Sequence, residues 1–255
     1  MYRFLATPRW LGYAVLALLL AVIMAGLGRW QLHRYHQRAA INARIDAGAG
    51  GPAVPITEAL PAPPGTGRRV GPAPSADAEW TRVRAVGRYD RDHEFLARNR
   101  TVNGEVGFEV LTPLLLADGA AVLVDRGWLA HPPGGALVEP EVPVPPTGEV
   151  TVIGPIRRPE SGADRPDRRS VRRISPATLP LPYRVYGGYL LLDRQVPAAD
   201  RRLTAIPPDH ENAWQNAGYV VQWWAFAVMV LVGYVYLARR EAHPPLADSR
   251  PGTPV

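Results

Sequence analysis

Two long apolar segments lie near opposite ends of this 255-residue chain. The first covers residues 10–28 and carries no charged or strongly polar side chain, whereas the second covers residues 217–238 and contains Gln222. Because a helix rises about 1.5 Å per residue, about 20 apolar residues cross a hydrocarbon core of about 30 Å. We therefore expect two transmembrane helices, which anchor the intervening chain at both ends.

The pattern between these segments changes to short apolar runs separated by turn-forming residues. Turn signals include Asn103-Gly104 and Asp118-Gly119. Such alternation predicts a mostly antiparallel β domain of the α+β class, with few helices, flanked by the two terminal transmembrane helices. The predicted strands cover residues 81–89, 94–98, 107–115, 121–129, 149–156, 184–192 and 201–206.

These patterns divide the chain into seven expected regions. The regions are a cytoplasmic N-terminus (1–9), a transmembrane helix (10–28), an interfacial helical extension (29–47), a Gly/Pro-rich connector (48–77), an extracytoplasmic β-rich domain (78–210), a second transmembrane helix (217–238) and a cytoplasmic tail (239–255). Within the β-rich domain, a short helix is also expected near residues 176–179.

Flanking charges orient the chain. Arg239 and Arg240 follow the second apolar segment, and Asp209 and Glu211 precede it, so the positive-inside rule places the C-terminus in the cytoplasm. Two spans then place the N-terminus there as well and the β-rich domain outside. The arginines that follow the first segment favour the opposite orientation, but the charge contrast across the second segment is cleaner.

The first apolar segment could be a signal peptide instead of a transmembrane helix. Arg3 and Arg9 could form the charged start of a signal peptide. Against this, the apolar stretch is long for a signal peptide and continues into GRWQLHRYHQR, which is typical of the interfacial end of a helix.

The same segment has a regular spacing of small residues. Ala17, Ala21 and Ala25 recur every four residues, a spacing that either allows close helix packing or reflects an alanine-rich composition.

The composition excludes several classes of function. The chain has no cysteine, so disulfides, thiolate metal sites, cysteine nucleophiles and covalent CxxCH haem attachment are excluded. Its net charge is +6 and all 29 basic residues are arginine, which indicates a coding bias rather than a nucleic-acid partner. No serine-hydrolase elbow, phosphate-binding loop, zinc-protease motif or dinucleotide fingerprint is present, so we expect no enzymatic activity.

Three histidines lie close in sequence to the membrane segments. His33 and His36 are spaced three residues apart on the expected helical extension, so they share a face, and His210 precedes the second segment. Imidazole is a good haem or metal ligand, which makes these residues candidate haem ligands; the alternative is that they are interfacial surface residues.

A charged motif, Asp125-Arg126-Gly127-Trp128, ends an apolar strand of the β-rich domain. Its charges form either an internal ion pair or a contact surface.

Four sequence blocks together resemble the surfeit locus (Shy) family of cytochrome c oxidase assembly factors. Residues 28–34 resemble its GxWQxxR motif, and residues 83–89 resemble its V-x-V-x-G-x-[YF] strand, with Ala85 in place of the second valine. Residues 107–128 resemble its VxTPL and VLVxRGW pair, and residues 218–227 resemble its YAxQWxxFA opening of the second membrane helix.

This resemblance implies a non-enzymatic role in maturation of haem-copper oxidase or in insertion of haem a into its catalytic subunit. It implies the plasma (inner) membrane as location, and as partners the catalytic subunit, other assembly factors and the lipid bilayer. Haem a would be a transient cofactor, with a direct haem a carrier and an extracytoplasmic enzyme or receptor as alternative functions. The expected partner contacts are Trp30, Gln31, Arg34, Asn216, Tyr219, Gln222, Trp223, Trp224, Arg126 and Trp128.

One position departs from the family pattern. Members thought to bind haem carry a histidine three residues before the tyrosine that opens the second helix. Here that tyrosine is Tyr219, and the matching residue is Asn216. Because an amide is a poor iron ligand compared with imidazole, direct haem ligation does not carry over to this position.

Overall fold

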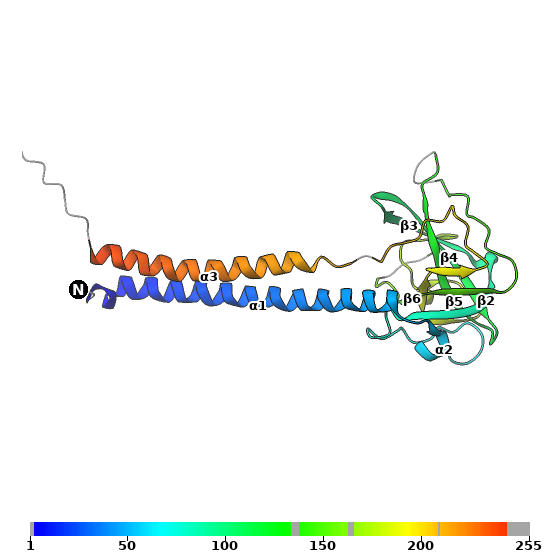
Figure 1. The fold of residues 1–255 in the computed structure, drawn as a ribbon, viewed down its shortest axis with the longest axis horizontal. Coiled ribbons are helices and arrows are strands. Elements are labelled where there is room, and N and C mark those ends of the chain that lie inside the picture. The colour runs from blue at the N-terminus through cyan, green and yellow to red at the C-terminus, as the bar shows by residue number, and fades with distance from the viewer. Residues whose placement is uncertain (1–2, 134–137, 163–165, 209, 244–255) are drawn as a thin grey trace, which may run out of the picture. The chain divides into compact units, whose positions relative to one another are not determined.

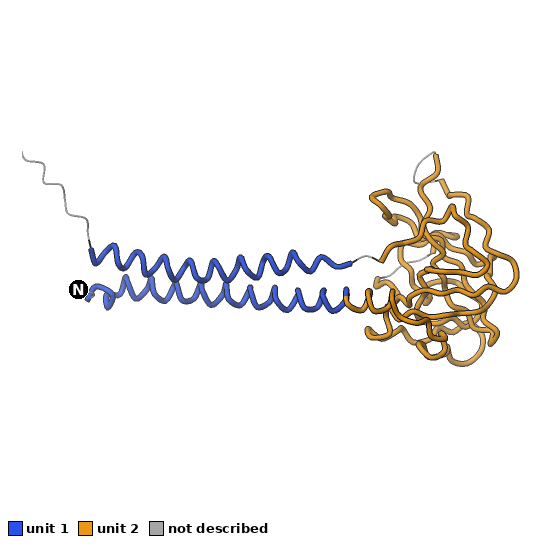
Figure 2. Tube along the Cα trace, in the orientation of Figure 1, with its two compact units in different colours: residues 1–42, 210–255 blue, residues 43–209 orange. Residues whose placement is uncertain are grey.

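The computed structural model describes residues 3–133, 138–162, 166–208 and 210–243 (Figure 1). The chain divides into two compact units (Figure 2). Unit 1 comprises Met1–Asn42 and His210–Val255, and unit 2 comprises Ala43–Asp209. Residues 244–255, most of the expected cytoplasmic tail, lie outside the described part of the chain.

Unit 1 is built from two long helices. A short 3-10 helix, η1 (Arg3–Ala6), precedes α1 (Pro8–Gly50), and α3 (Ala213–Ala242) returns antiparallel to α1. The Trp10 and Tyr234 rings meet near one end of the pair, with centroids 6.0 Å apart. Both helices are long and apolar enough to cross a membrane, as the sequence pattern predicts. This gives the chain the architecture of a two-pass membrane protein.

Small residues line the contact between these helices. Ala17 and Ala21 are buried, as the four-residue spacing predicts for a packing face, whereas Ala25 is exposed. Large apolar side chains such as Leu18 and Val228 are exposed on the outside of the pair. This distribution suits a lipid environment, where apolar side chains face the acyl chains.

Unit 2 is a β domain, and its strands belong to one nine-stranded sheet. The strands β2, β6, β8, β5 and β4 form a closed ring, because β4 also pairs with β2. Most pairs are antiparallel, but β5–β8, β3–β7 and β1–β2 are parallel. The strands are β1 (Val54–Pro55), β2 (Arg82–Tyr89), β3 (Phe95–Val102), β4 (Glu105–Leu116), β5 (Ala120–Ala130), β6 (Val150–Arg157), β7 (Ser170–Val171), β8 (Arg184–Leu191) and β9 (Arg194–Val196).

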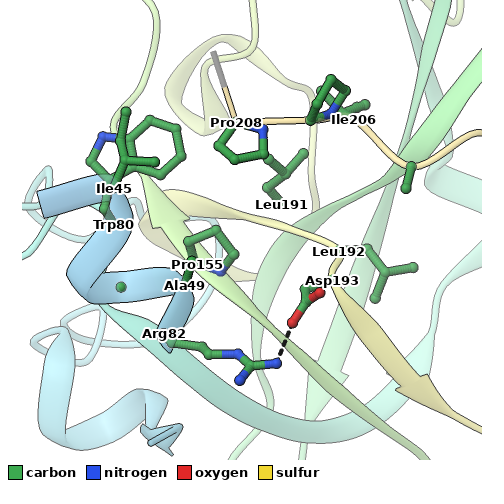
Figure 3. A pocket seen from close by; sticks show the side chains of 13 residues that line it. Ile45, Ala49, Trp80, Arg82, Pro155, Leu191, Leu192, Asp193, Ile206 and Pro208 are labelled. Carbon is green, nitrogen blue, oxygen red and sulfur yellow. Dashed lines mark hydrogen bonds and ion pairs between the residues drawn. The ribbon is translucent and has the colours of Figure 1, made fainter. Parts of the chain in front are cut away.

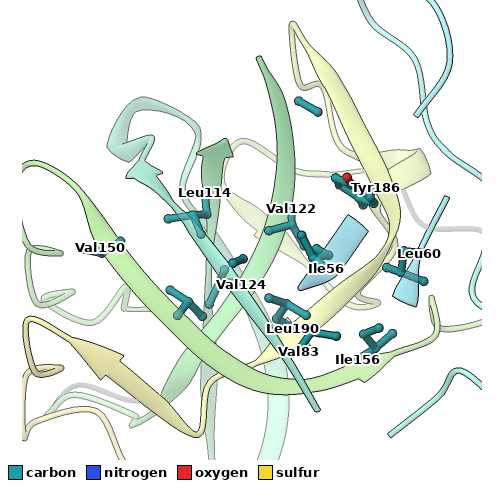
Figure 4. Close-up of a cluster of buried hydrophobic side chains, with 13 residues drawn as sticks. Ile56, Leu60, Val83, Leu114, Val122, Val124, Val150, Ile156, Tyr186 and Leu190 are labelled. Atoms are coloured by element: carbon teal, nitrogen blue, oxygen red, sulfur yellow. The ribbon is translucent and has the colours of Figure 1, made fainter. Parts of the chain in front are cut away.

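The period-2 pattern of the strands explains the core of the ring. Along β2, Val83 and Ala85 point inward and are buried, while Arg84 and Arg88 are exposed. The main hydrophobic cluster fills the inside of the ring with aliphatic side chains from each of its strands (Figure 4). The predicted fold class, two terminal helices flanking a mostly antiparallel β domain, is confirmed.

The expected connector, residues 48–77, is more ordered than its Gly/Pro-rich composition indicates. It contains β1 and a helical turn, α2 (Ile56–Ala59). Ile56 and Leu60 are buried in the main cluster beside the ring strands (Figure 4). These two apolar residues anchor the segment to the core, which composition alone does not reveal.

One predicted strand is wrong. Residues 201–206 form no strand and contribute a single isolated bridge, between Thr204 and Trp128. A turn at Asp200–Leu203 precedes this bridge and Pro207 follows it, so the ladder has no room to extend. The sequence pattern also missed the short strands β7 and β9. The expected short helix is present as η3 (Pro176–Thr178), and η2 (Arg91–His93) is a further 3-10 turn.

Candidate functional site

The helix pair of unit 1 contains a buried polar contact. Helix α3 begins after Asn212, whose side-chain oxygen caps the helix by accepting from the backbone N–H of Gln215 (3.2 Å). This start places Asn216 one turn into the helix, facing α1, where its side-chain NH₂ donates to the side-chain oxygen of Gln31 (2.7 Å). Asn216 is 9 % exposed, and its Oδ1 has no hydrogen-bond partner among the described residues.

A close approach fixes the neighbouring layer of the pair. Gly28 lies on α1 against the indole of Trp224, and a Cβ added at Gly28 would overlap that ring. The glycine therefore provides the space in which the indole lies. Trp224 remains 44 % exposed, so its outer face is free for contact with lipid or protein.

Hydrogen bonds hold the start of α3 to α1 beyond this layer. The side chain of Asn42 accepts from the backbone N–H of Glu211 (2.8 Å) and donates to the Glu211 carbonyl (2.8 Å). Arg38 donates to the Asn212 carbonyl (3.1 Å) and forms an ion pair with Glu211 (3.5 Å). Sequence reasoning missed this clamp, although the polar residues at positions 38 and 42 of the extension were a visible signal.

The aromatic residues predicted for partner contact are largely exposed. Trp30 is 56 % exposed and Tyr219 is 41 % exposed. Gln222 is exposed, and half-buried Trp223 meets Phe226 edge-on, with centroids 6.1 Å apart. Exposed Tyr and Trp side chains combine a large rigid apolar surface with one polar handle, which suits them to hold a partner helix or to fix helix depth in the bilayer.

The candidate haem ligands of α1 lie on its surface. His33 and His36 are exposed, and Nε2 of His33 accepts a hydrogen bond from the Gln37 amide (2.9 Å). Arg34 is also exposed and donates to Gln37 (3.4 Å). His210 is exposed ahead of α3. Within the described part of the chain, no group of three or more His, Cys, Asp or Glu residues converges in a way that could hold a metal ion.

Haem iron does not fit position 216, where the sequence resemblance implies a ligand. Asn216 offers an amide whose NH₂ is engaged by Gln31, and an amide oxygen is a poor ligand for haem iron compared with imidazole. An axial ligand would have to come from one of the exposed histidines.

Arg126 and Trp128, the two predicted contact residues of unit 2, are buried. Arg126 pairs with Glu94 (3.1 Å), and Trp128 donates its indole N–H to the Arg100 carbonyl (2.9 Å). Burial lowers the pKa of Arg126. Of the two alternatives for the Asp125–Trp128 motif, the structure supports the internal ion pair, so any partner contact through these residues would require other groups to move.

Sequence reasoning missed a second, partly buried charge cluster in unit 2. Arg100 makes two hydrogen bonds of 2.8 Å to the Glu160 carboxylate and an ion pair of 3.2 Å to Glu109. Burial, and then the neighbouring Glu109, raise the pKa of Asp125 well above its ordinary value, and burial raises that of Glu109. The visible signal was a carboxylate within each of two strongly apolar strands, β4 and β5.

Comparison with known proteins gives consistent matches over most of the chain. A sequence model of the SURF1 family matches residues 18–228. A SURF1-like protein of Mycobacterium bovis is 31 % identical over 247 residues, covering 93 % of this chain and 86 % of the relative. A SURF1-like protein of Mycobacterium tuberculosis matches with the same values, and one of Monosiga brevicollis is 31 % identical over 159 residues, covering 55 % of this chain and 52 % of the relative.

Proposed function

The chain belongs to the SURF1 family, generally known as a family of cytochrome oxidase assembly factors rather than enzymes, and from this premise we propose its specific role. It assists the maturation of the catalytic subunit of a haem-copper cytochrome c oxidase, including insertion of haem a. It acts as a scaffold, without catalytic activity of its own.

The observation that carries this proposal is the set of exposed aromatic side chains on a fixed helix pair. The Gln31–Asn216 hydrogen bond and the Gly28–Trp224 contact hold α1 against α3. Trp30, Tyr219 and Trp224 then present rigid surface outward from neighbouring layers of the pair. Hydrophobic burial contributes little to helix association in lipid, so helices associate there mainly through van der Waals packing and interhelical hydrogen bonds. A rigid aromatic surface offers a membrane-embedded subunit such packing.

The proposed location is the plasma (inner) membrane, with both termini in the cytoplasm and unit 2 outside. The support is the charge asymmetry across α3, where Glu211 precedes the helix and Arg239 and Arg240 occupy its last turn. In this orientation unit 2 would meet the extracytoplasmic parts of the oxidase. Its partners would be the catalytic subunit and other assembly factors.

A direct haem a carrier is the alternative, and the structure gives it less support. Its candidate ligands are the exposed residues His33, His36 and His210, whereas Asn216 does not fit iron. Arg34 could pair with a haem propionate or with a lipid phosphate, since guanidinium binds both anions through paired hydrogen bonds. No step of the proposed scaffold role requires haem to be bound by this chain.

Affinity purification from native membranes tests the proposal. The tagged chain is expected to recover the oxidase catalytic subunit, identified by mass spectrometry. Trp30→Ala combined with Tyr219→Ala should reduce that recovery several-fold, because both remove exposed aromatic surface. Tyr236→Ala is the matched control, since Tyr236 is 63 % exposed in the last turns of α3.

The same samples separate the scaffold from the carrier. Wild-type chain that recovers the catalytic subunit but shows no haem a absorption of its own supports the scaffold. A haem a spectrum that is lost when His33, His36 or His210 is replaced by alanine supports the carrier instead. Recovery of no oxidase subunit by the wild-type chain would contradict the scaffold, and a purified chain without haem a absorption would contradict the carrier.

A further inference from the structure

Unit 2 contains an apolar hollow of about 320 Å³, a size typical of small-molecule sites (Figure 3). Ile45 and Ala49 of α1 line it together with Trp80, and Leu191 and Ile206 line it as well (Figure 3). Its charged lining residues, Arg82 and Asp193, are bound to each other (Figure 3). The rest of the wall is therefore free to contact an apolar group.

A second, polar hollow of about 490 Å³ adjoins the first. Leu191, Ile206 and two prolines, Pro207 and Pro208, line both of them. A further link is a stacked pair: the guanidinium of Arg157, which lines the polar hollow, lies 3.9 Å from the ring centroid of Trp80, which lines the apolar one. An apolar and a polar compartment thus share a wall.

The two arginines of the polar hollow, Arg100 and Arg157, are already paired. Arg100 is bound by Glu160 and Glu109, and Arg157 pairs with Glu79 (3.5 Å). A charged group that entered would find no spare counter-ion, and an uncompensated charge in a partly buried site is unfavourable. Burial raises the pKa of Asp125 well above its ordinary value, which reduces the charge that this carboxyl contributes to the hollow. The pairing therefore favours an uncharged ligand.

Neutral polar residues also line the polar hollow. They are Asn99, Thr101 and Asn103. Their amide and hydroxyl groups can donate hydrogen bonds to a carbonyl or hydroxyl oxygen without adding charge. These residues favour an uncharged head that carries oxygen atoms.

We propose that the two hollows together bind a neutral amphiphile, with its hydrocarbon tail in the apolar hollow and an oxygen-bearing uncharged head in the polar hollow. The bilayer is the source that the chain connectivity suggests. Ile45 and Ala49 continue the helix that carries the first span, and Pro208 lies shortly before the second. This binding site is independent of the proposed assembly role, which rests on unit 1.

Photo-crosslinking of the full chain in detergent tests the site. The probe is a monoacylglycerol with a diazirine in its acyl chain, and labelled peptides are mapped by mass spectrometry. We expect label on peptides that contain Trp80 or Ile206. Unlabelled monooleoylglycerol should compete at least tenfold better than oleate or oleylamine, which have a similar tail but a charged head.

Variants that fill the apolar hollow provide the second arm. Ala205→Trp is expected to reduce the label on these peptides at least tenfold, and Ala117→Trp, in a turn outside both hollows, should leave it unchanged. If Ala205→Trp fails to fold by circular dichroism, Ala49→Phe fills the hollow from α1. Label confined to α1 and α3 outside the hollow, label that neither variant reduces, or preference for a charged head would overturn the proposal.

Discussion

The side-chain amide of Asn216 donates a hydrogen bond of 2.7 Å to the side-chain oxygen of Gln31, which joins the first turns of α3 to the middle of α1. Gln31 belongs to the block that ends the first apolar segment, and Asn216 stands where haem-binding relatives are expected to carry histidine. The two residues therefore serve helix packing in this chain. Their pairing gives the side-chain NH₂ of Asn216, a residue that is 9 % exposed, a hydrogen-bond acceptor.

Asn216→Leu is expected to destabilise the helix pair by about 0.6–2 kcal/mol, the range for interhelical hydrogen bonds in membranes. Unfolding of the full chain in detergent, followed by circular dichroism, measures this change. Replacing both partners by leucine should recover most of the loss, because no polar group is then left unpaired. Gln222→Leu, at an exposed position of the same helix, is the control and should have little effect. Equal effects at positions 216 and 222 would refute the packing role.

Gly28→Leu is expected to separate α1 from α3 locally, because its side chain would occupy the space of the Trp224 indole. Overpacking of this kind costs about 1–3 kcal/mol. Gly26→Leu is the matched control, since a Cβ at Gly26 meets no atom within 4 Å. The midpoint of thermal unfolding in detergent should therefore be clearly lower for Gly28→Leu than for Gly26→Leu and wild type. An unchanged midpoint for Gly28→Leu would contradict the close contact.

The raised pKa of the buried Asp125 carboxyl predicts how the stability of the chain depends on pH. Its carboxyl pKa is raised by burial and by Glu109 well above the ordinary 3.8, so the folded chain keeps a proton that the unfolded chain has released. The free energy of unfolding should accordingly fall as pH rises from about 4 through the raised pKa. Asp125→Asn should flatten this dependence, and Glu105→Gln, at an exposed position of β4, should preserve it. Chemical denaturation at a series of pH values measures the slope, and equal slopes in wild type and Asp125→Asn would contradict the shift.

The buried pair Glu94–Arg126 should respond asymmetrically to mutation. Glu94→Gln leaves the buried Arg126 guanidinium without its carboxylate partner and should cost about 3–5 kcal/mol. Arg126→Met should cost less, because Glu94 keeps its ion pair of 2.6 Å to Arg169. Glu141→Gln, which breaks an exposed pair with Arg202, should cost less than about 1 kcal/mol. Denaturant unfolding measures all three, and a larger loss for Arg126→Met than for Glu94→Gln would refute this assignment of partners.

Local patterns in the sequence predict most elements of this fold. The apolar segments give both long helices, and β2, β4, β5, β6 and β8 fall within a few residues of the predicted strands, because side-chain periodicity is a local property. The ring closure between β2 and β4 could not be read in this way, since it depends on register between distant residues such as Gly87 and Leu116. The same limit explains why residues 201–206 were wrongly predicted as a strand: their pairing, the isolated bridge between Thr204 and Trp128, depends on a residue far away in the sequence.

The candidate site shows the same division. The sequence identified Gln31 and Asn216 separately, but only the fold brings them together. It left open whether Arg126 is a contact residue or part of an ion pair, and the answer depends on Glu94, which lies 32 positions earlier. The Arg100–Glu160 pairing joins residues 60 positions apart and had no local sequence signal.

Deletion of the gene for this protein, with optical difference spectra of the isolated membranes, tests the proposed assembly role most directly. We predict a several-fold loss of the haem a band and of cytochrome c oxidase activity, with succinate dehydrogenase activity retained and the losses restored by the wild-type gene. Unchanged haem a spectra and oxidase activity in the deletion strain would contradict the assembly role.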